Sequence, residues 1–190
     1  RWENIVSDLP FGETVDVTLK VDGQSCSFYY DLESDQFGVL GRTLEMKPEA
    51  KNAYTNQVDR YGIREKLISY CQEVGRSLVI RGESYGRGIQ SFGNNPHSAA
   101  DPGWAMFSVY DIKDRRYYVR GEDHYFINVA ERLGLPTVQV LQKDVVLDRE
   151  LIDHYSVGIS QIDGKPFEGV VILHSQGSFK VINKDYDSKK

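Results

Sequence analysis

The chain has 190 residues, with 28 acidic residues against 23 Lys and Arg, so its formal net charge is −5. This length suits one domain with a mixed core, and no apolar run approaches the roughly 20 residues that a bilayer-crossing helix needs. An acidic chain is a poor general binder of nucleic acid, because that affinity comes from neutralising phosphates with Lys and Arg. A local basic groove is still compatible with the composition.

The N-terminal sequence and the cysteines favour an intracellular location. There is no signal-peptide pattern, and the chain opens on Arg1 without a methionine. We therefore expect an intracellular protein and a fragment of a longer chain. Cys26 and Cys71 are too few for a disulfide framework and lack metal-ligand spacing, which predicts buried, reduced thiols.

The first strand pattern ends in a lysine. Residues 14–21 alternate apolar and polar side chains, and residues 25–30 continue the pattern after Asp22-Gly23. This predicts an antiparallel hairpin whose glycine takes positive φ. Lys20 lies at the end of the first strand. A lysine amine, with a reference pKa near 10.4, becomes a nucleophile only where neighbouring cations or burial favour its neutral form. The simpler interpretation is a hairpin with an exposed lysine.

The next segments predict a third strand and a pair of helices. Residues 37–40 read as a short strand, and Arg42 follows it, where it could reach a phosphate or ribose or simply be solvated. Apolar and aromatic residues then recur at helical spacing over 54–61 and 63–74. The two stripes are out of phase at Gly62, so we expect two helices or a broken one.

A β-branched run over residues 78–85 predicts a strand that presents Glu83 near its end. A loop rich in Gly, Asn and Pro extends from Gly86 to Gly103. Its Gly86-Arg87-Gly88 lacks the strand-to-helix setting of a dinucleotide-binding loop, so we reject that interpretation.

The second half alternates strands with two short helices. Residues 104–112 form an aromatic-rich strand that we expect to pair with 117–119 in a hairpin. Residues 126–133 have helical spacing and stop at Gly134. A short strand at 138–141, a helix capped by Asp148, and a strand pair at 168–173 and 178–182 complete the chain.

Five short motifs, each at a strand or a strand end, occur in a familiar order. They are Lys20-Val21-Asp22-Gly23, Gly82-Glu83, Tyr110-Asp111-Ile112, Glu168-Gly169-Val170-Val171 and Phe179-Lys180-Val181-Ile182. Over nearly its whole length the chain resembles the covalent nucleotidyltransferases, which comprise ATP-dependent RNA ligases, DNA ligases and RNA-capping guanylyltransferases. Residues 37–43 and 82–90 resemble the RNA ligases most, in particular those with an additional OB domain ahead of the ligase domain.

The resemblance implies an α+β nucleotidyltransferase fold of the ATP-grasp-like ligase type, with antiparallel sheets flanked by helices and a nucleotide cleft. Residues 1–190 would form this single domain of a longer protein. The implied activity is ATP-dependent RNA ligation: Lys20 takes AMP from ATP, AMP passes to a 5′-phosphate, and a 3′-hydroxyl displaces it. The implied partners are RNA ends, with a nicked duplex as one form, and no membrane.

The resemblance also gives roles to individual residues near the nucleotide. Leu19 would line the nucleotide site, Glu83 would hold the ribose hydroxyls, and Arg42 would support the same sugar and phosphate. Tyr110 would stack on the adenine. A stacked aromatic ring tolerates any base, contributing about 1–3 kcal/mol.

The remaining roles concern charge. Lys180 would contact the α-phosphate, while Glu168 and Asp22 would help to hold Mg²⁺ or Mn²⁺, which prefer carboxylate oxygens. One departure is that relatives with a Lys-x-Lys motif have a second lysine where this chain has Ile182, and Lys184 is the nearest substitute. Open alternatives are a DNA ligase, a GTP-dependent capping enzyme, and a silent domain that binds nucleotide or nucleic-acid ends.

Overall fold

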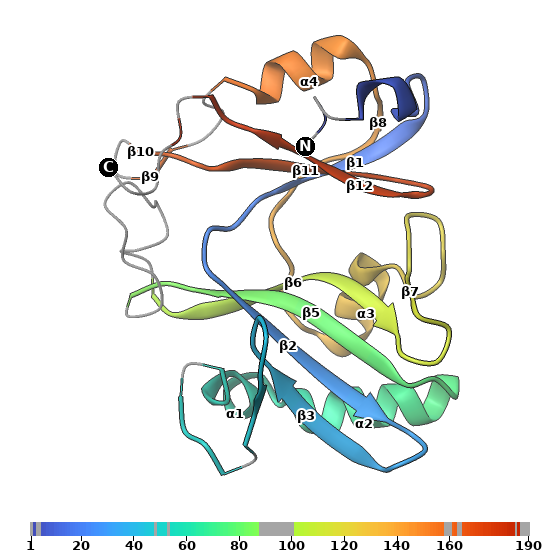
Figure 1. The fold of residues 1–190 in the computed structure, drawn as a ribbon, viewed down its shortest axis with the longest axis vertical. Coiled ribbons are helices and arrows are strands. Elements are labelled where there is room, and N and C mark those ends of the chain that lie inside the picture. Colours follow the sequence, from blue (N-terminus) through green and yellow to red (C-terminus); the bar gives the residue numbers. More distant parts are fainter. Residues whose placement is uncertain are drawn as a thin grey trace.

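The structure, a computed structural model, describes residues 2, 5–47, 49–52, 54–87, 101–157, 161–162, 165–184 and 186. Two antiparallel sheets dominate the fold (Figure 1). The four-stranded sheet has the order β12 (Gly177–Ile182), β11 (Gly169–His174), β1 (Thr14–Leu19) and β8 (Val140–Val146). The six-stranded sheet has the order β4 (Glu45–Met46), β3 (Gln36–Leu40), β2 (Gln24–Asp31), β5 (Leu78–Tyr85), β6 (Gly103–Asp111) and β7 (Arg116–Tyr117).

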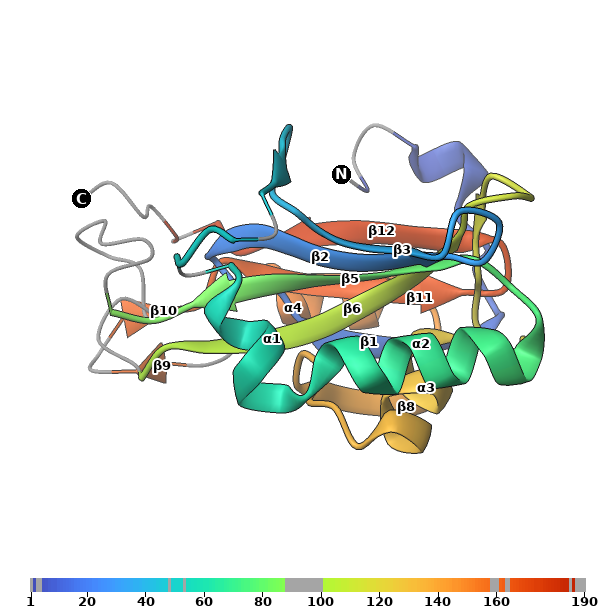
Figure 2. The same ribbon diagram turned by 90° about the horizontal axis from the view of Figure 1, so that it is seen from below.

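Helices cover the outer faces of both sheets (Figures 1 and 2). On the six-stranded sheet, α2 (Ile63–Val74) packs on β2 and α3 (Phe126–Leu133) packs on β6, with α1 (Asn56–Tyr61) leading into α2. On the four-stranded sheet, α4 (Arg149–Tyr155) packs on β12. A short 3-10 helix (Val6–Asp8) and the small pair β9 (Gln161–Ile162) and β10 (Lys165–Pro166) complete the described elements.

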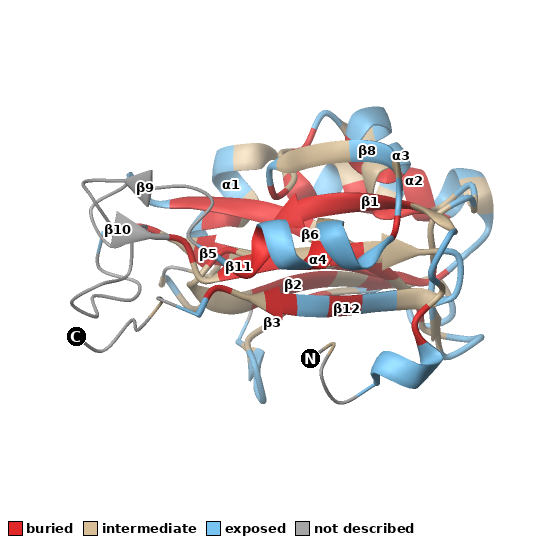
Figure 3. Cartoon of the chain, turned by 90° about the horizontal axis from the view of Figure 1, so that it is seen from above, coloured by how far each residue is buried: buried red, intermediate tan, exposed pale blue. Residues whose placement is uncertain are grey.

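Each sheet therefore has its own core beneath its helices. The larger core, under α2 and α3, is built around the fully buried side chains of Phe28, Ile80 and Trp104. The smaller core under α4 includes Val17 and Ile172, both 0% exposed. Figure 3 shows that β1 is buried over most of its length. With the apolar sides turned outward to the helices, polar residues of β1 can face the other sheet.

The expected hairpin between the first two strands is wrong. β1 pairs with β11 and β8, whereas β2 pairs with β3 and β5, so the chain crosses from one sheet to the other between them. Gly23 does not take positive φ. A Cβ there would lie 2.1 Å from the carbonyl oxygen of Ser84, so glycine is needed for close approach to β5. Alternation predicts that both segments are strands but does not say which strand each one joins.

Most other elements are where the sequence predicts them. Gly62, at φ 63°, separates α1 from α2, and the Asp148 carboxylate accepts a hydrogen bond from the Leu151 amide at 2.8 Å at the start of α4. β8 starts two residues later and runs longer than the expected strand at 138–141, β7 is shorter than expected, and β4 was not anticipated.

The thiols of Cys26 and Cys71 are free and buried, as expected, and burial raises the pKa of each to about 12. Within the described ranges, no helix is long and apolar enough to cross a membrane. Most of the loop predicted between residues 86 and 103 lies outside the described residues.

Candidate active site

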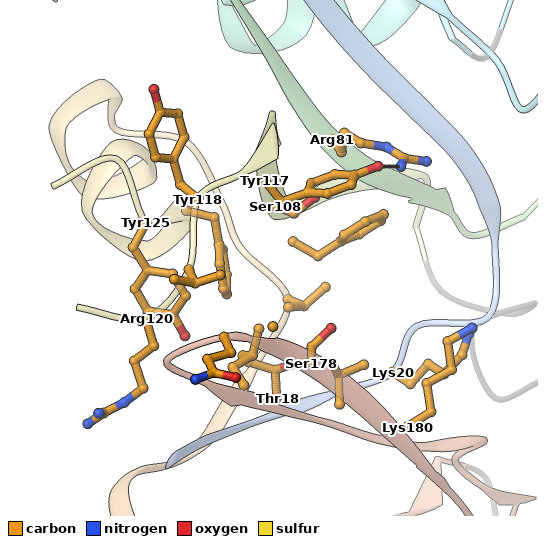
Figure 4. A pocket seen from close by; sticks show the side chains of 18 of the residues that line it. Thr18, Lys20, Arg81, Ser108, Tyr117, Tyr118, Arg120, Tyr125, Ser178 and Lys180 are labelled. Atoms are coloured by element: carbon orange, nitrogen blue, oxygen red, sulfur yellow. Dashed lines mark hydrogen bonds between the residues drawn. The ribbon is translucent and has the colours of Figure 1, made fainter. Parts of the chain in front are cut away.

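A cavity of about 810 Å³ lies between the inner faces of the two sheets. Strands β1, β11 and β12 line one side, and β5, β6 and residues 116–126 line the other (Figure 4). Its volume is in the range of pockets that hold a small organic ligand. The site residues predicted from the sequence can be located relative to this cavity.

Lys20 lies where the chain leaves β1 for the other sheet. Its backbone N–H donates to the carbonyl of Gly169 at 2.9 Å, which fixes it to the start of β11. Its Nζ is 3.3 Å from Oε2 of Glu168, and the two side chains are 20% and 22% exposed. Both the lysine and its carboxylate partner are therefore positioned by the pairing of β1 with β11.

Glu83 faces the same cavity from β5. Burial raises the pKa of this carboxyl to about 7, with Lys20 lowering it and the nearby carboxylates of Glu168 and Asp22 raising it further. Asp22 also accepts a hydrogen bond from the Tyr186 hydroxyl. Three carboxylates thus gather around one lysine, an environment that favours binding of a further cation.

A metal ion would have to share this site with a ligand. In the part of the chain that the structure describes, no three His, Cys, Asp or Glu side chains are grouped closely enough to hold a metal by themselves. Glu168 and Asp22 could supply part of a coordination shell. This suits Mg²⁺ or Mn²⁺ bound mainly through water and phosphate oxygens, since Mg²⁺ usually takes only one or two protein carboxylates.

Lys180 completes the charged end of the cavity. It lies on β12 directly opposite Val171 of β11, and it lines the cavity. Figure 4 shows its side chain beside that of Lys20. Two lysines at one end of a cavity can neutralise a phosphate group.

The structure brings together only some of the predicted residues. Leu19, Lys20, Glu83 and Lys180 line the cavity. Glu168 joins them through its ion pair with Lys20, and Asp22 through its electrostatic effect on Glu83.

Among the described residues, two predicted ones, Tyr110 and Arg42, neither line the cavity nor interact with the predicted residues that do. Tyr110 is half-buried opposite Tyr117 in the β6–β7 pair, with 4.9 Å between the ring centroids, and it is Tyr117 that lines the cavity. Arg42 is exposed in the segment after β3. Neither contributes to the cavity wall as described, and their roles stay predictions. Lys184 is exposed, while the half-buried Ile182 lies opposite Gly169 in the β11–β12 ladder.

Sequence reasoning missed the three arginines that line the cavity, Arg81, Arg116 and Arg120, and it missed Asp16, the partner of Arg120. For Asp16 and Arg81 a signal was present in the sequence. The signal was strand parity, because residues an even number apart share a face of a strand. Asp16 is four residues before Lys20, and Arg81 is two before Glu83, so each shares a face with a residue that the motifs had singled out.

This fold and site define a nucleotidyltransferase domain, with a lysine between two antiparallel sheets and acidic residues at the neighbouring strand ends. The RNA ligase family pattern matches residues 13–184, and the chain belongs to this family. Among proteins with curated descriptions, none matches the chain.

Solved structures support the same assignment. A mutant of the Naegleria gruberi RNA ligase with ATP and Mn is 27% identical, with a TM-score of 0.76 over 97% of this chain and 53% of that one. The same ligase with PPi is 29% identical, with a TM-score of 0.75 over 93% of this chain and 51% of that one. A mutant with AMP and Mn is 26% identical, with a TM-score of 0.75 over 94% and 53%. The chain spans about half the length of these structures.

Proposed function

We propose that this chain is the adenylation domain of an ATP-dependent RNA ligase, residues 1–190 forming one domain of a longer protein. The observation that carries the proposal is the position of Lys20. Its amine lies between the two sheets, 3.3 Å from Glu168, at a cavity that Glu83 and Lys180 also line. The similarity to ligase structures solved with ATP, AMP and Mn supports ATP and a divalent metal as cofactors.

The first step is transfer of AMP to Lys20. The neutral amine attacks the α-phosphorus of ATP, the N–P bond forms, the bond from phosphorus to the pyrophosphate oxygen breaks, and one proton is released to solvent. Lys180 neutralises charge on the α-phosphate, and Glu83 holds the ribose hydroxyls. Mg²⁺ or Mn²⁺, held by Glu168 and Asp22, would add positive charge at the phosphates.

The later steps join RNA ends. AMP passes from Lys20 to a 5′-phosphate, and a 3′-hydroxyl then attacks that phosphorus and releases AMP. A nicked duplex would hold the two ends in line. Because the chain carries a net charge of −5, we expect an additional domain of the same protein to contribute to RNA binding, and the separate 190-residue chain to seal ends weakly at moderate salt.

Labelling with α-³²P-ATP and Mn²⁺, followed by denaturing electrophoresis, tests the proposal. The wild-type chain, first stripped of adenylate with pyrophosphate, should take label from ATP but not from GTP. Lys20→Ala should not take label, and neither should Lys20→Arg, since guanidinium stays protonated. Lys143→Ala, which removes an exposed lysine of β8, is the matched control and should label like wild type. Label from GTP alone would indicate a capping enzyme, and no label in the wild type would indicate a silent binding domain.

A further inference from the structure

Arg81 lies inside the cavity, two residues before Glu83 on the same face of β5. Its guanidinium is 5.9 Å from the ring centroid of Phe107 and 5.8 Å from that of Tyr117. One of its N–H groups donates to the Tyr117 hydroxyl, as Figure 4 shows. The side chain is thus held in place by two aromatic rings and one hydrogen bond.

Three arginines line the cavity, and Arg81 differs from the other two in charge pairing. Arg116 forms an ion pair with Glu122 at 2.5 Å, and Arg120 forms one with Asp16 at 3.2 Å. Among the described residues Arg81 forms no ion pair, and only one of its five N–H donors is used, by Tyr117. A half-buried guanidinium with free donors in a ligand cavity is available to acceptors of a ligand.

The depth of Arg81 indicates which part of a nucleotide it would meet. Alternate residues of a strand are about 7 Å apart, so Arg81 lies about that far from Glu83, on the side away from Lys20 and Lys180. If the lysines hold the phosphates and Glu83 the ribose, the base lies next to Arg81. The walls there are apolar: Phe107 comes from one sheet, and Val171 and Leu173 come from the other. A flat aromatic base fits between such walls, with its edge toward the guanidinium.

We propose that Arg81 contacts the purine base, donating to a ring nitrogen, and that the Tyr117 hydroxyl orients its guanidinium. This inference rests on the proposed adenylation of Lys20 and deepens it, because it names a residue that contacts the base. Arginine has donors only, so it recognises the acceptor nitrogens of the purine and leaves the exocyclic amino group to other partners.

Steady-state label transfer separates this role from a structural one. Arg81→Met keeps the long apolar stem but removes the donors, and it should raise the KM for ATP about tenfold while changing kcat less than twofold, because the contact is remote from the α-phosphorus. Tyr117→Phe should raise KM about threefold. The matched control is Arg64→Met, since Arg64 also lies over a phenylalanine ring, that of Phe37 at 5.4 Å, but does not line this cavity. It should leave both constants unchanged.

Purine analogues test the contact itself. ATP analogues in which the nitrogen at ring position 1, 3 or 7 is replaced by CH are compared in wild type and Arg81→Met. With wild type, one analogue should have a kcat/KM about tenfold below that of ATP. With Arg81→Met, the same analogue and ATP should have equal kcat/KM, because the variant and the analogue each remove the same hydrogen bond. If Arg81→Met does not fold by circular dichroism, the same comparison is made with Arg81→Leu, which also lacks donors.

Two outcomes separate failure of this inference from failure of the proposed function. If wild type takes no label from ATP, the adenylation proposal fails. If wild type labels normally, and either the KM of Arg81→Met equals that of wild type or every analogue loses equally in both proteins, adenylation stands and Arg81 does not contact the base.

Discussion

Asp16, near the start of β1, and Lys20, just past its end, carry opposite charges in different settings. Asp16, Thr18 and Lys20 lie on the face of β1 that turns toward the other sheet. At one end, the 2% exposed Asp16 accepts hydrogen bonds from the Tyr125 hydroxyl at 3.0 Å and the Asp144 amide at 3.1 Å, and pairs with Arg120 at 3.2 Å. At the other end, Lys20 pairs with Glu168 at 3.3 Å, and both side chains stay partly exposed.

This contrast distinguishes a structural ion pair from a reactive one. Asp16 is buried with three partners from β8 and from the segment before α3, so it ties the four-stranded sheet to residues that come after β7. Lys20 keeps access to the cavity and has one carboxylate partner near its amine. We therefore expect the Asp16 end to determine stability and the Lys20 end to determine chemistry.

The largest expected effect is on chemistry. Lys20→Ala should lower the rate of label transfer at least about a thousandfold, since a lost nucleophile is not replaced by its neighbours. Its free energy of unfolding should change by about 1 kcal/mol or less, because the pair with Glu168 is partly exposed. Urea titration followed by fluorescence measures the second quantity. A loss of several kcal/mol would show that the Lys20 end is structural as well.

The reverse result is expected at the other end. Asp16→Ala leaves the largely buried Arg120 without its buried partner and should lower the free energy of unfolding by about 3 kcal/mol. Label transfer per folded molecule should stay within about threefold of wild type. Asp144→Asn is the matched control, since Asp144 also pairs with Arg120 but is 70% exposed, and asparagine removes the charge while tolerating the positive φ of this residue. It should lower the free energy of unfolding by about 0.5 kcal/mol. Equal losses in the two variants would contradict the distinction.

The sequence could predict the reactive end but not the structural one. Lys20 belongs to a short motif and lies at the end of an alternating segment, and both features are local. The role of Asp16 depends on Arg120 and Tyr125, which are more than 100 residues away, and strand alternation does not say which segments the fold will bring to that face. The false hairpin has the same origin. A strand pattern gives the face of each residue, whereas the choice of sheet depends on close contacts such as that of Gly23 with Ser84.

A smaller effect is expected for the partner of Lys20. Glu168→Gln keeps the size of the side chain but removes its charge, and label transfer should fall about tenfold at fixed Mn²⁺, as for loss of a group that helps to hold a metal. The deficit should narrow as Mn²⁺ is raised. Stability should change by less than about 1 kcal/mol, measured by the same urea titration. An undiminished rate at low Mn²⁺ would remove Glu168 from the reactive end.

The smallest effect is a pH dependence at the structural end. Burial and the adjacent Asp16 carboxylate raise the pKa of Tyr125. The unfolded chain would release this proton near pH 10, its ordinary value, while the folded chain still holds it. The stabilisation is therefore fully present below about pH 10 and is lost as pH rises through the folded pKa, at about 1.4 kcal/mol per pH unit.

Tyr125→Phe isolates that contribution. At pH 7 its free energy of unfolding should be about 1 kcal/mol below that of wild type, because no hydroxyl donates to Asp16. Asp16 keeps Arg120 and the Asp144 amide as partners. Above pH 10 this difference in free energy of unfolding should shrink, because only wild type has a hydroxyl proton that the unfolded chain releases. Urea titrations from pH 7 to 11 measure the gap, and the other tyrosines cancel in the difference. A gap that stays constant across this range would show that the Tyr125 hydroxyl is not bound to Asp16 in the folded protein.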